Sequence, residues 1–284
     1  MYKALSGFYY VKAENNSCFQ CKARGKLKKE KIKPFVGDKV EISTISTTEG
    51  VIEEVLPRKN LFHRPTVSNI DQLVIMIASE QPKPDFLLVD TLLALAESHQ
   101  VESLICVTKV DLNNDIVDFV KSRFSNSKYP VLGISNKSLV GIENLRKYLS
   151  GKISCLSGQS GVGKSSLINT INKDVNFKVG DISRKIKRGK HTTTHSSLVE
   201  IFDNSFIVDT PGFSNISLEQ IDIQDLPRLF NEFELYSCKF STCSHTEENN
   251  CGVIEAVKTG DIHLQRYNNY LMLRKKIKQI KERY

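Results

Sequence analysis

The sequence predicts an α/β protein in three parts: a small β-barrel, a domain of alternating strands and helices, and a helical end. Short strand patterns separated by turn residues fill about the first 68 residues. Apolar runs then alternate with helical periodicity to about residue 216, where strand patterns stop. Such alternation is typical of a parallel sheet covered by helices. We therefore expect domains at residues 1–68, 69–216 and 217–284.

Composition and charge narrow the class of protein. Of the 284 residues, 40% are apolar and 25% are charged, which is typical of a globular rather than a disordered chain. The formal net charge of +8 favours a polyanionic partner, either nucleic acid or a membrane surface, unless the charge serves only solubility. The sequence shows neither a leader pattern nor a run of 18 apolar residues, so we expect a cytoplasmic protein with no membrane partner. In a reducing compartment, the seven cysteines are expected to be metal ligands or buried thiols.

The first part combines strand patterns with positive charge. Residues 40–42 and 51–56 are strand candidates beside turn signals, and short strands at this spacing predict a small closed barrel such as the OB-fold. From Lys22 to Lys33, seven residues are basic and only Glu30 is acidic. The stretch is either a solvated hairpin face or a surface that contacts phosphates, and the barrel favours the second interpretation. Cys18 and Cys21 have no second cysteine pair nearby and are interpreted as incidental.

The second part contains a regular series of elements. We expect Asp85 to cap a helix that ends near residue 98, and Cys106 and Cys155 to be buried on strands. Ligands of such sheets bind at the carboxyl ends of the strands. The expected strands are residues 73–78, 104–107, 131–134, 153–156, 199–202 and 206–208, and the other expected helices are residues 116–124, 142–149 and 164–171.

A phosphate-binding loop follows one of these strands. Residues 158–165 read G-Q-S-G-V-G-K-S, and they lie between a predicted strand and a predicted helix, as the motif G-x-x-x-x-G-K-[ST] requires. Glycines allow backbone N–H groups to point at phosphate oxygens, and the helix amino terminus adds partial positive charge. We expect Lys164 to neutralise the β- and γ-phosphates and Ser165 to bind Mg²⁺. The loop predicts a nucleoside triphosphate without choosing the base. The expected nucleotide-binding residues here also include Gly158, Gln159, Ser160, Gly161, Val162, Gly163 and Ser166.

Two loops indicate guanine. Residues 108–111 read T-K-V-D at a strand end, where the Asp111 carboxylate can accept hydrogen bonds from N1–H and the exocyclic amine of guanine. The Lys109 stem can lie over the base, and Thr108 is counted with this loop. The next strand ends in Ser135, Asn136 and Lys137, whose backbone N–H groups can reach the guanine O6. Each of these two signals is weak alone. The tetrapeptide T-K-V-D, for example, is common by chance at strand ends.

The γ-phosphate has its own candidates. Residues 209–212 read D-T-P-G after a strand; Asp209 can hold Mg²⁺ through water and the Gly212 N–H can reach the γ-phosphate. The alternative is an ordinary turn. Of the three threonines at residues 192–194, Thr193 is favoured to complete the Mg²⁺ shell.

These elements resemble translation-factor GTPases in permuted order, because the guanine loops precede the phosphate loop here. With the basic barrel and the terminal cysteines, the chain is similar to the circularly permuted GTPases that depend on the small ribosomal subunit, the RsgA or YjeQ family. The resemblance implies an OB-fold, a permuted GTPase domain and a zinc domain. It also implies GTP hydrolysis stimulated by the small (30S) subunit during its late maturation, with contacts to 16S rRNA. Thr108 and Asn136 depart from the Asn and Ala common in GTPases.

The water-positioning group is not evident. Phe213 stands where GTPases of that class have a catalytic Gln, and an apolar side chain cannot orient water. His191 and His195 are candidates for orienting the water. We group His191 with Lys164 and Thr193 as catalytic residues. The alternative is that the ribosome completes the site. We expect low intrinsic turnover.

The third part holds a metal motif. Cys238, Cys243, His245 and Cys251 form C-x₄-C-x-H-x₅-C, a closed set for one structural zinc ion, unless these are scattered buried cysteines. A basic helix at about residues 261–283 is either a solvated face or an RNA contact.

Three functional classes follow. The chain is a monomeric GTPase that acts with GTP, Mg²⁺ and the small ribosomal subunit, a metabolic kinase or ATPase, or an RNA-binding protein with an inactive nucleotide site. The first is preferred, and base selectivity at Asp111 separates it from the second.

Overall fold

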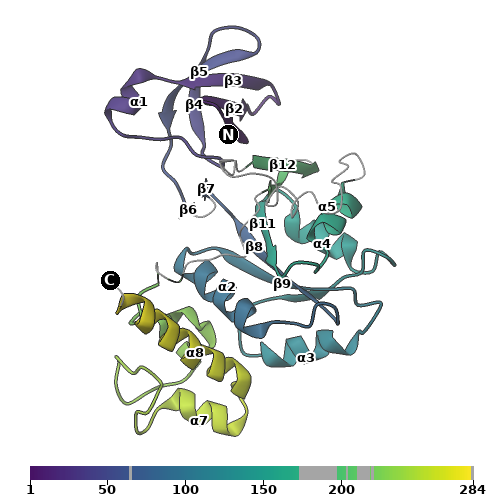
Figure 1. Ribbon diagram of the computed structural model, residues 1–284, viewed down its shortest axis with the longest axis vertical. Helices are drawn as coiled ribbons and strands as arrows, with labels where there is room; N and C mark the ends of the chain where they lie inside the picture. The colour runs from purple at the N-terminus through teal and green to yellow at the C-terminus, as the bar shows by residue number, and fades with distance from the viewer. Residues whose placement is uncertain (64–65, 173–196, 203, 210–217, 219–220, 283–284) are drawn as a thin grey trace. The chain divides into compact units, whose positions relative to one another are not determined.

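The computed structural model describes residues 1–63, 66–172, 197–202, 204–209, 218 and 221–282 (Figure 1). The chain packs as two compact units that interleave along the sequence. The first unit contains residues 1–72, 146–156 and 165–215, and the second contains residues 73–145, 157–164 and 216–284. Among the described residues, no helix combines the length and apolar character needed to cross a membrane.

The amino-terminal residues of the first unit form the expected OB-fold barrel. Strands neighbour one another in the order β1-β2-β3-β5-β4, with β3 and β5 parallel and the other pairs antiparallel. Helix α1 connects β3 to β4. The barrel core contains Val11, Phe19, Cys21 and Ile52, with Leu27 from α1. The bounds are β1 Lys3–Leu5, β2 Phe8–Lys12, β3 Cys18–Ala23, α1 Gly25–Lys29, β4 Val40–Thr44 and β5 Glu49–Val55.

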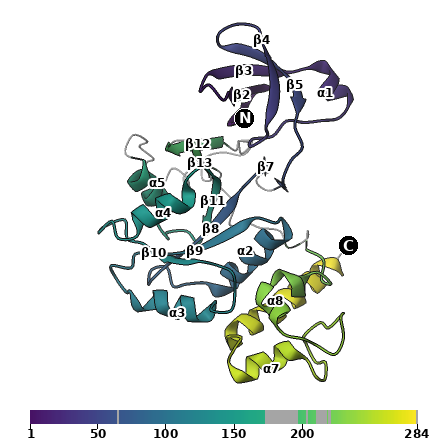
Figure 2. The same ribbon diagram turned by 180° about the vertical axis from the view of Figure 1, so that it is seen from behind.

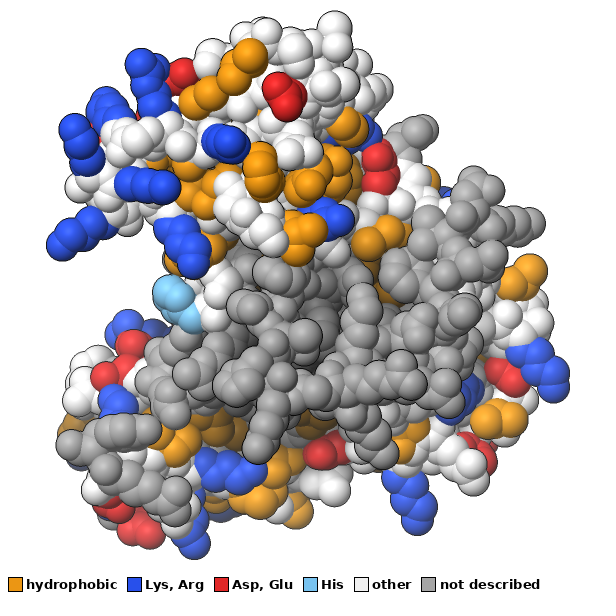
Figure 3. All heavy atoms as spheres, turned by 45° about the horizontal axis from the view of Figure 1, so that its top comes forward, with side chains coloured by type: hydrophobic (Ala, Val, Ile, Leu, Met, Phe, Trp, Pro, Cys, Tyr) orange, Lys and Arg blue, Asp and Glu red, His pale blue; other side chains and the backbone are white. Residues whose placement is uncertain are grey.

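The basic stretch of the barrel does not form the hairpin face that was one interpretation of it. Residues 25–29 form helix α1, in which Leu27 is buried in the barrel core while its lysine neighbours remain exposed. Lys and Arg side chains gather on one side of the amino-terminal part in Figure 3. Cys18 is exposed and Cys21 is buried, because residues three apart on a strand face opposite sides. These two thiols therefore do not form one metal site.

The rest of the first unit extends this sheet. Strand β1 pairs antiparallel with β12, β12 pairs antiparallel with β13, and β13 pairs parallel with β11. The antiparallel β12 departs from the wholly parallel sheet that was expected. The bounds are β6 Leu61–His63, β7 Thr66–Ser68, α4 Ile142–Leu149, β11 Ile153–Gly158, α5 Lys164–Ile171, β12 Ser197–Phe202 and β13 Ser205–Asp209.

The second unit contains the strands β8, β9 and β10 and the helical carboxyl-terminal segment. The strands are neighbours in the order β10-β9-β8, and β9 and β10 run parallel. Every residue of β8 is buried, which explains its continuous apolar run. The Asp85 carboxylate accepts the Leu88 N–H at 3.0 Å, which confirms the expected helix cap. The bounds are β8 Gln72–Ala78, α2 Phe86–Ser98, β9 Glu102–Thr108, α3 Asp115–Arg123 and β10 Val131–Gly133.

The carboxyl-terminal segment of this unit is helical. Figure 2 shows α7 beside α8, with α8 also against α2. Phe230, Phe233, Tyr270 and Leu273 lie in a core that includes Ala94 of α2. The bounds are η2 Leu226–Leu229, η3 Asn231–Leu235, α7 Gly252–Thr259 and α8 Leu264–Lys281.

Candidate functional site: a nucleotide-binding loop and a metal centre

The phosphate loop is shaped by glycines that other residues cannot replace. Gly158 has φ = 140° and Gly163 has φ = 98°, which are conformations that L side chains rarely adopt. A Cβ atom on Gly158 would also lie 2.1 Å from the Met76 carbonyl oxygen. The loop can therefore pass directly against β8. The Lys164 Nζ donates to the carbonyl oxygens of Gly158 and Gln159 at 2.6 Å and 2.8 Å.

The middle of the phosphate loop changes from exposed to buried within three residues. Ser160 and Gly161 are exposed, whereas the Val162 side chain is fully buried. Packing does not fix the exposed side chain of Ser160. We therefore assign the expected nucleotide contact of Ser160 to its backbone N–H, and this contact stays a prediction. Val162 likewise has only its backbone to offer a ligand, because its side chain has no accessible surface.

Strand β9 places the first guanine-binding candidates beside this loop. The Lys109 Nζ donates to the Gly161 carbonyl oxygen at 2.9 Å, so its side chain reaches the phosphate loop; its place over the base stays a prediction. Lys109 has φ = 60°, and its carbonyl oxygen accepts a hydrogen bond from the Ser79 hydroxyl at 2.7 Å. Ser79 was not identified from the sequence, because a serine after a strand carries no distinctive pattern.

Thr108 has a different place from the nucleotide contact that was expected. It is fully buried, and its Oγ1 lies 2.7 Å from the carbonyl oxygen of Val162 and 3.2 Å from that of Ile77. The hydroxyl therefore joins the end of β9 to the phosphate loop. In this structure, Thr108 positions two loops and has no surface with which to touch a ligand.

Asp111 and Ser135 meet across the ends of β9 and β10. The Ser135 hydroxyl donates to Asp111 Oδ1 at 2.5 Å, and this hydrogen bond lowers the pKa of the Asp111 carboxyl group. A carboxylate that stays ionised can accept two N–H groups from guanine, whereas adenine offers no matching pair. The backbone N–H of Lys137 also donates to the Ser135 hydroxyl oxygen, at 3.2 Å. The two guanine loops predicted from the sequence are thus in direct contact.

Two buried polar atoms near the loops have no hydrogen-bond partner within the described part of the chain. They are Asn136 Oδ1 and Gln159 Oε1. Asn136 Nδ2 would be 3.5 Å from a Cβ atom on Gly163, so this side chain lies against the phosphate loop. In folded proteins, a buried acceptor without a partner calls for an explanation, and an ordered water is one.

The remaining nucleotide candidates are only partly described. Ser165 and Ser166 are half-buried residues in the first turn of α5. Asp209 ends β13, where the expected strand end was placed, but its side chain lies outside the description. His191, Thr193, His195, Gly212 and Phe213 also lie outside the described residues.

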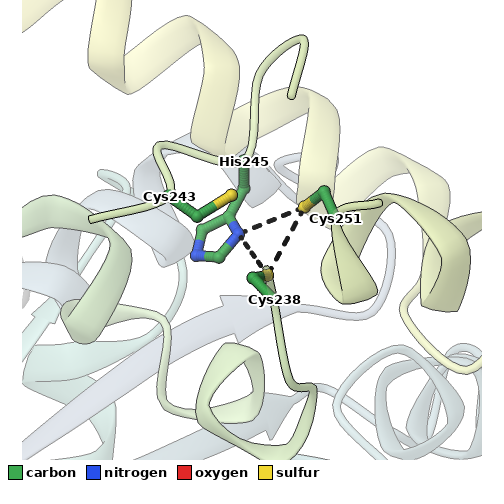
Figure 4. Close-up of side chains that lie close together, drawn as sticks. All are labelled: Cys238, Cys243, His245 and Cys251. Atoms are coloured by element: carbon green, nitrogen blue, oxygen red, sulfur yellow. Dashed lines mark hydrogen bonds between the residues drawn. The ribbon is translucent and has the colours of Figure 1, made fainter. Parts of the chain in front are cut away.

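The four metal-ligand candidates converge on one point. Their ligand atoms all lie within 4.8 Å of one another, and Figure 4 shows the side chains of Cys238, Cys243, His245 and Cys251 directed toward a common centre. Sγ of Cys238 is 3.7 Å from Sγ of Cys251, and His245 Nδ1 is 3.5 Å and 3.3 Å from these two sulfur atoms.

The separations among the ligand atoms of Cys238, His245 and Cys251 fit a tetrahedral zinc ion. Bonds of about 2.3 Å to sulfur and about 2.0 Å to nitrogen place ligand atoms roughly 3.8 Å apart for two sulfurs and roughly 3.6 Å apart for sulfur and nitrogen. Burial lowers the pKa of His245, which favours the neutral imidazole that binds metals. Three thiolates and one imidazole leave no open position, so the site suits a structural ion.

The loop between the ligands is held by residues that the sequence did not reveal. The Glu248 carboxylate accepts the Ser244 N–H at 2.6 Å and the Thr246 N–H at 2.8 Å. The Tyr267 hydroxyl of α8 donates to the His245 carbonyl oxygen at 2.8 Å. No sequence pattern could indicate these contacts, because they depend on how the loop folds back on α8.

Comparisons with known proteins identify related chains. The family model described as RsgA GTPase matches residues 55–219, and the RsgA N-terminal domain model matches residues 1–52. A relative in Ruminiclostridium cellulolyticum, named small ribosomal subunit biogenesis GTPase RsgA, is 41% identical over 98% of this chain and 93% of its own length. A relative of the same name in a Geobacillus species is 42% identical over 99% of this chain and 98% of its own length.

Solved structures give the same result. The crystal structure of YjeQ from Thermotoga maritima has a TM-score of 0.87 and 37% identity, and the match covers 97% of this chain and 96% of that one. YloQ, described as a circularly permuted GTPase, has a TM-score of 0.83 and 32% identity over 100% of this chain and 96% of that one. The order of the nucleotide loops, the family model and these relatives together show that the chain belongs to the RsgA family of circularly permuted GTPases.

Proposed function

We propose that this chain binds GTP, hydrolyses it with Mg²⁺, and acts on the small ribosomal subunit late in the subunit's maturation. The observation that carries the proposal is the pairing of Ser135 with Asp111 next to a phosphate loop. An ionised carboxylate, fixed by a hydroxyl, is suited to read guanine, and the loop is suited to hold phosphates. The names of the relatives, which describe biogenesis of the small ribosomal subunit, support the choice of partner.

The residues of the chain divide the work in this proposal. When GTP binds, the Lys164 ammonium group leaves the two carbonyl oxygens that it contacts in this structure and binds β- and γ-phosphate oxygens. There it neutralises the negative charge that grows as the γ-phosphate leaves. The Ser165 hydroxyl, together with Thr193, would hold the Mg²⁺ ion, which draws charge from the phosphate oxygens. Asp209 and Gly212 would sense the γ-phosphate.

The proposal assigns low activity to the isolated chain. Phe213 cannot orient water, so either His191 does so or the ribosomal subunit completes the site. GTP turnover with and without purified small subunits is the deciding measurement. A strong increase with subunits is expected; fast turnover without them would contradict this part of the proposal, and a failure of subunits to stimulate would remove the assigned partner.

Base choice tests the class of enzyme. Asp111→Asn should shift preference from guanosine to xanthosine nucleotides, because an amide can donate to the second carbonyl oxygen of xanthine. A metabolic kinase or ATPase would show no such exchange. Lys164→Ala should abolish a working GTPase, whereas a plain RNA-binding protein would keep its activity. Zinc in the Cys₃His centre, a monomeric state, a cytoplasmic location, contacts with 16S rRNA and domain boundaries near residues 68 and 216 belong to the same proposal.

A further inference from the structure

Helix α8 presents one set of side chains to a buried carboxylate of α2. Asp90 is fully buried in the middle of that helix. Its Oδ1 accepts from Arg266 Nη1 at 2.6 Å, and its Oδ2 accepts from Asn269 Nδ2 at 2.6 Å. The Oδ2 atom also accepts from Arg123 Nη2 at 2.8 Å. Arg266 in turn donates to both oxygens of Glu232. The two arginines and two carboxylates balance in charge, which permits their burial.

This network lies at the helices that flank the guanine-binding strand. Asp90 belongs to α2, which leads into β9 and its last residue, Thr108. Arg123 is the last residue of α3, the helix that begins four positions after Asp111. At about 1.5 Å per residue, the 9 residues of α3 span roughly 13 Å between these two ends. Helix α3 thus connects Arg123 to the loop that carries Asp111.

The same helix presents a second set of side chains to the metal loop. The Tyr267 hydroxyl donates to the His245 carbonyl oxygen, and the Tyr270 hydroxyl donates to that of Ser244. Tyr270 is fully buried and stacks edge-on against Phe233. Arg266 and Asn269 thus alternate along α8 with two tyrosines that hold the backbone between the metal ligands.

We propose that α8 is a positioning element for guanine recognition, in which the metal loop holds α8 and α8 holds α2 and α3 through Asp90. This inference rests on the proposed function, since it concerns how tightly the chain binds guanine. Loss of the metal would loosen the loop that carries the Ser244 and His245 carbonyl oxygens, and so weaken the two tyrosine hydrogen bonds that hold α8. Asp111 would then be less well fixed when guanine arrives.

The first test compares two buried asparagines in the full-length, metal-loaded chain. Asn269→Ala removes one hydrogen bond to Asp90 without leaving an unpaired charge. Asn60 is a matched control, since it is similarly enclosed and its side chain bonds to Ile70, at 2.8 Å and 2.9 Å. We expect Asn269→Ala to weaken GDP binding about tenfold, within the usual range of coupling between sites. Asn60→Ala should lower the melting temperature and leave GDP affinity unchanged.

Base selectivity distinguishes a loss of positioning from a loss of folded protein. A variant that is only partly folded binds less GDP per chain with unchanged selectivity, whereas a misplaced Asp111 lowers the ratio of the ADP and GDP dissociation constants. The expected result for Asn269→Ala is a fall in this ratio, measured by calorimetry. Equal ratios in the unsubstituted chain and in Asn269→Ala would overturn the inference. If the unsubstituted chain bound no guanine nucleotide, the proposed function itself would have failed.

A second test remains decisive if Asn269→Ala does not fold. Backbone hydrogen exchange is followed in the unsubstituted chain before and after removal of the metal with a chelator, and in Tyr270→Phe. We expect faster exchange in residues 86–98 and 115–123 as well as in the metal loop, because α8 connects them. Faster exchange confined to residues 236–251 would show that the metal loop acts alone and would overturn the inference.

Discussion

The hydroxyl group of Thr108 provides the sharpest test of how the nucleotide site is assembled. Thr108→Val keeps the shape of the side chain and removes only its hydrogen-bonding capacity. The bond to the Val162 carbonyl oxygen is 2.7 Å long and fully buried, so no water can replace it. A lost hydrogen bond that leaves a buried acceptor unpaired costs about 1–3 kcal/mol.

The expected effect on affinity follows from where the bond lies. The hydrogen bond joins β9, which leads to the guanine-binding residues, to the phosphate loop. In the variant these two segments lose their alignment, and GDP must restore it when it binds. At about 1.4 kcal/mol for each factor of ten, a cost near the low end of the range weakens GDP binding roughly fivefold to tenfold. The structure offers a control in Thr91→Val, because the half-buried Thr91 hydroxyl bonds within its own helix, to the Leu87 carbonyl oxygen at 2.6 Å.

Calorimetric titration with GDP measures both variants under the same magnesium concentration. Thr108→Val should show the loss of affinity with little change in base preference, since Asp111 and its Ser135 partner stay in place. Thr91→Val should bind as the unsubstituted chain does. If Thr108→Val bound GDP within a factor of two of the unsubstituted chain, the bond would not contribute to assembling the site.

Further predictions concern the phosphate loop, the buried thiols and the metal loop. Gly158→Ala should abolish measurable GDP binding, because its Cβ atom would meet the Met76 carbonyl oxygen; calorimetry that found normal affinity would contradict the described loop. Burial raises the pKa of Cys106 to about 12, so native alkylation at pH 8 should label the exposed Cys18 and spare Cys106, as mass spectrometry of digested protein can show. Despite the opposing effect of burial, hydrogen bonds lower the pKa of Glu248 to about 2 from 4.5. The ionised Glu248 carboxylate therefore stabilises the fold fully above pH 4.5, and this stabilisation is lost as the pH falls toward 2. The difference in melting temperature between the unsubstituted chain and Glu248→Gln should shrink across that range. A difference independent of pH would exclude this role for the carboxylate.

The sequence anticipated features that local chemistry dictates. The phosphate loop was identifiable because tight phosphate wrapping requires glycines at fixed spacing, and Gly158 and Gly163 indeed have positive φ. The metal cluster was identifiable because four ligands within 14 residues have few other uses, and their ligand atoms converge. The cap at Asp85 followed from the same kind of short-range rule. In each case, the residues that determine the feature are neighbours in the chain.

Features that join distant residues needed the tertiary structure. Thr108 was expected at the ligand and lies buried against the phosphate loop, because only the packing of β9 decides which way its hydroxyl points. Asp90 was not identified from the sequence, because its two arginine partners are 33 and 176 positions away. Sequence therefore determined the chemistry available to this protein, since side-chain type and spacing are written in the chain. Tertiary structure decided which of those groups meet, because burial and hydrogen-bond pairing depend on contacts between segments that no local pattern encodes.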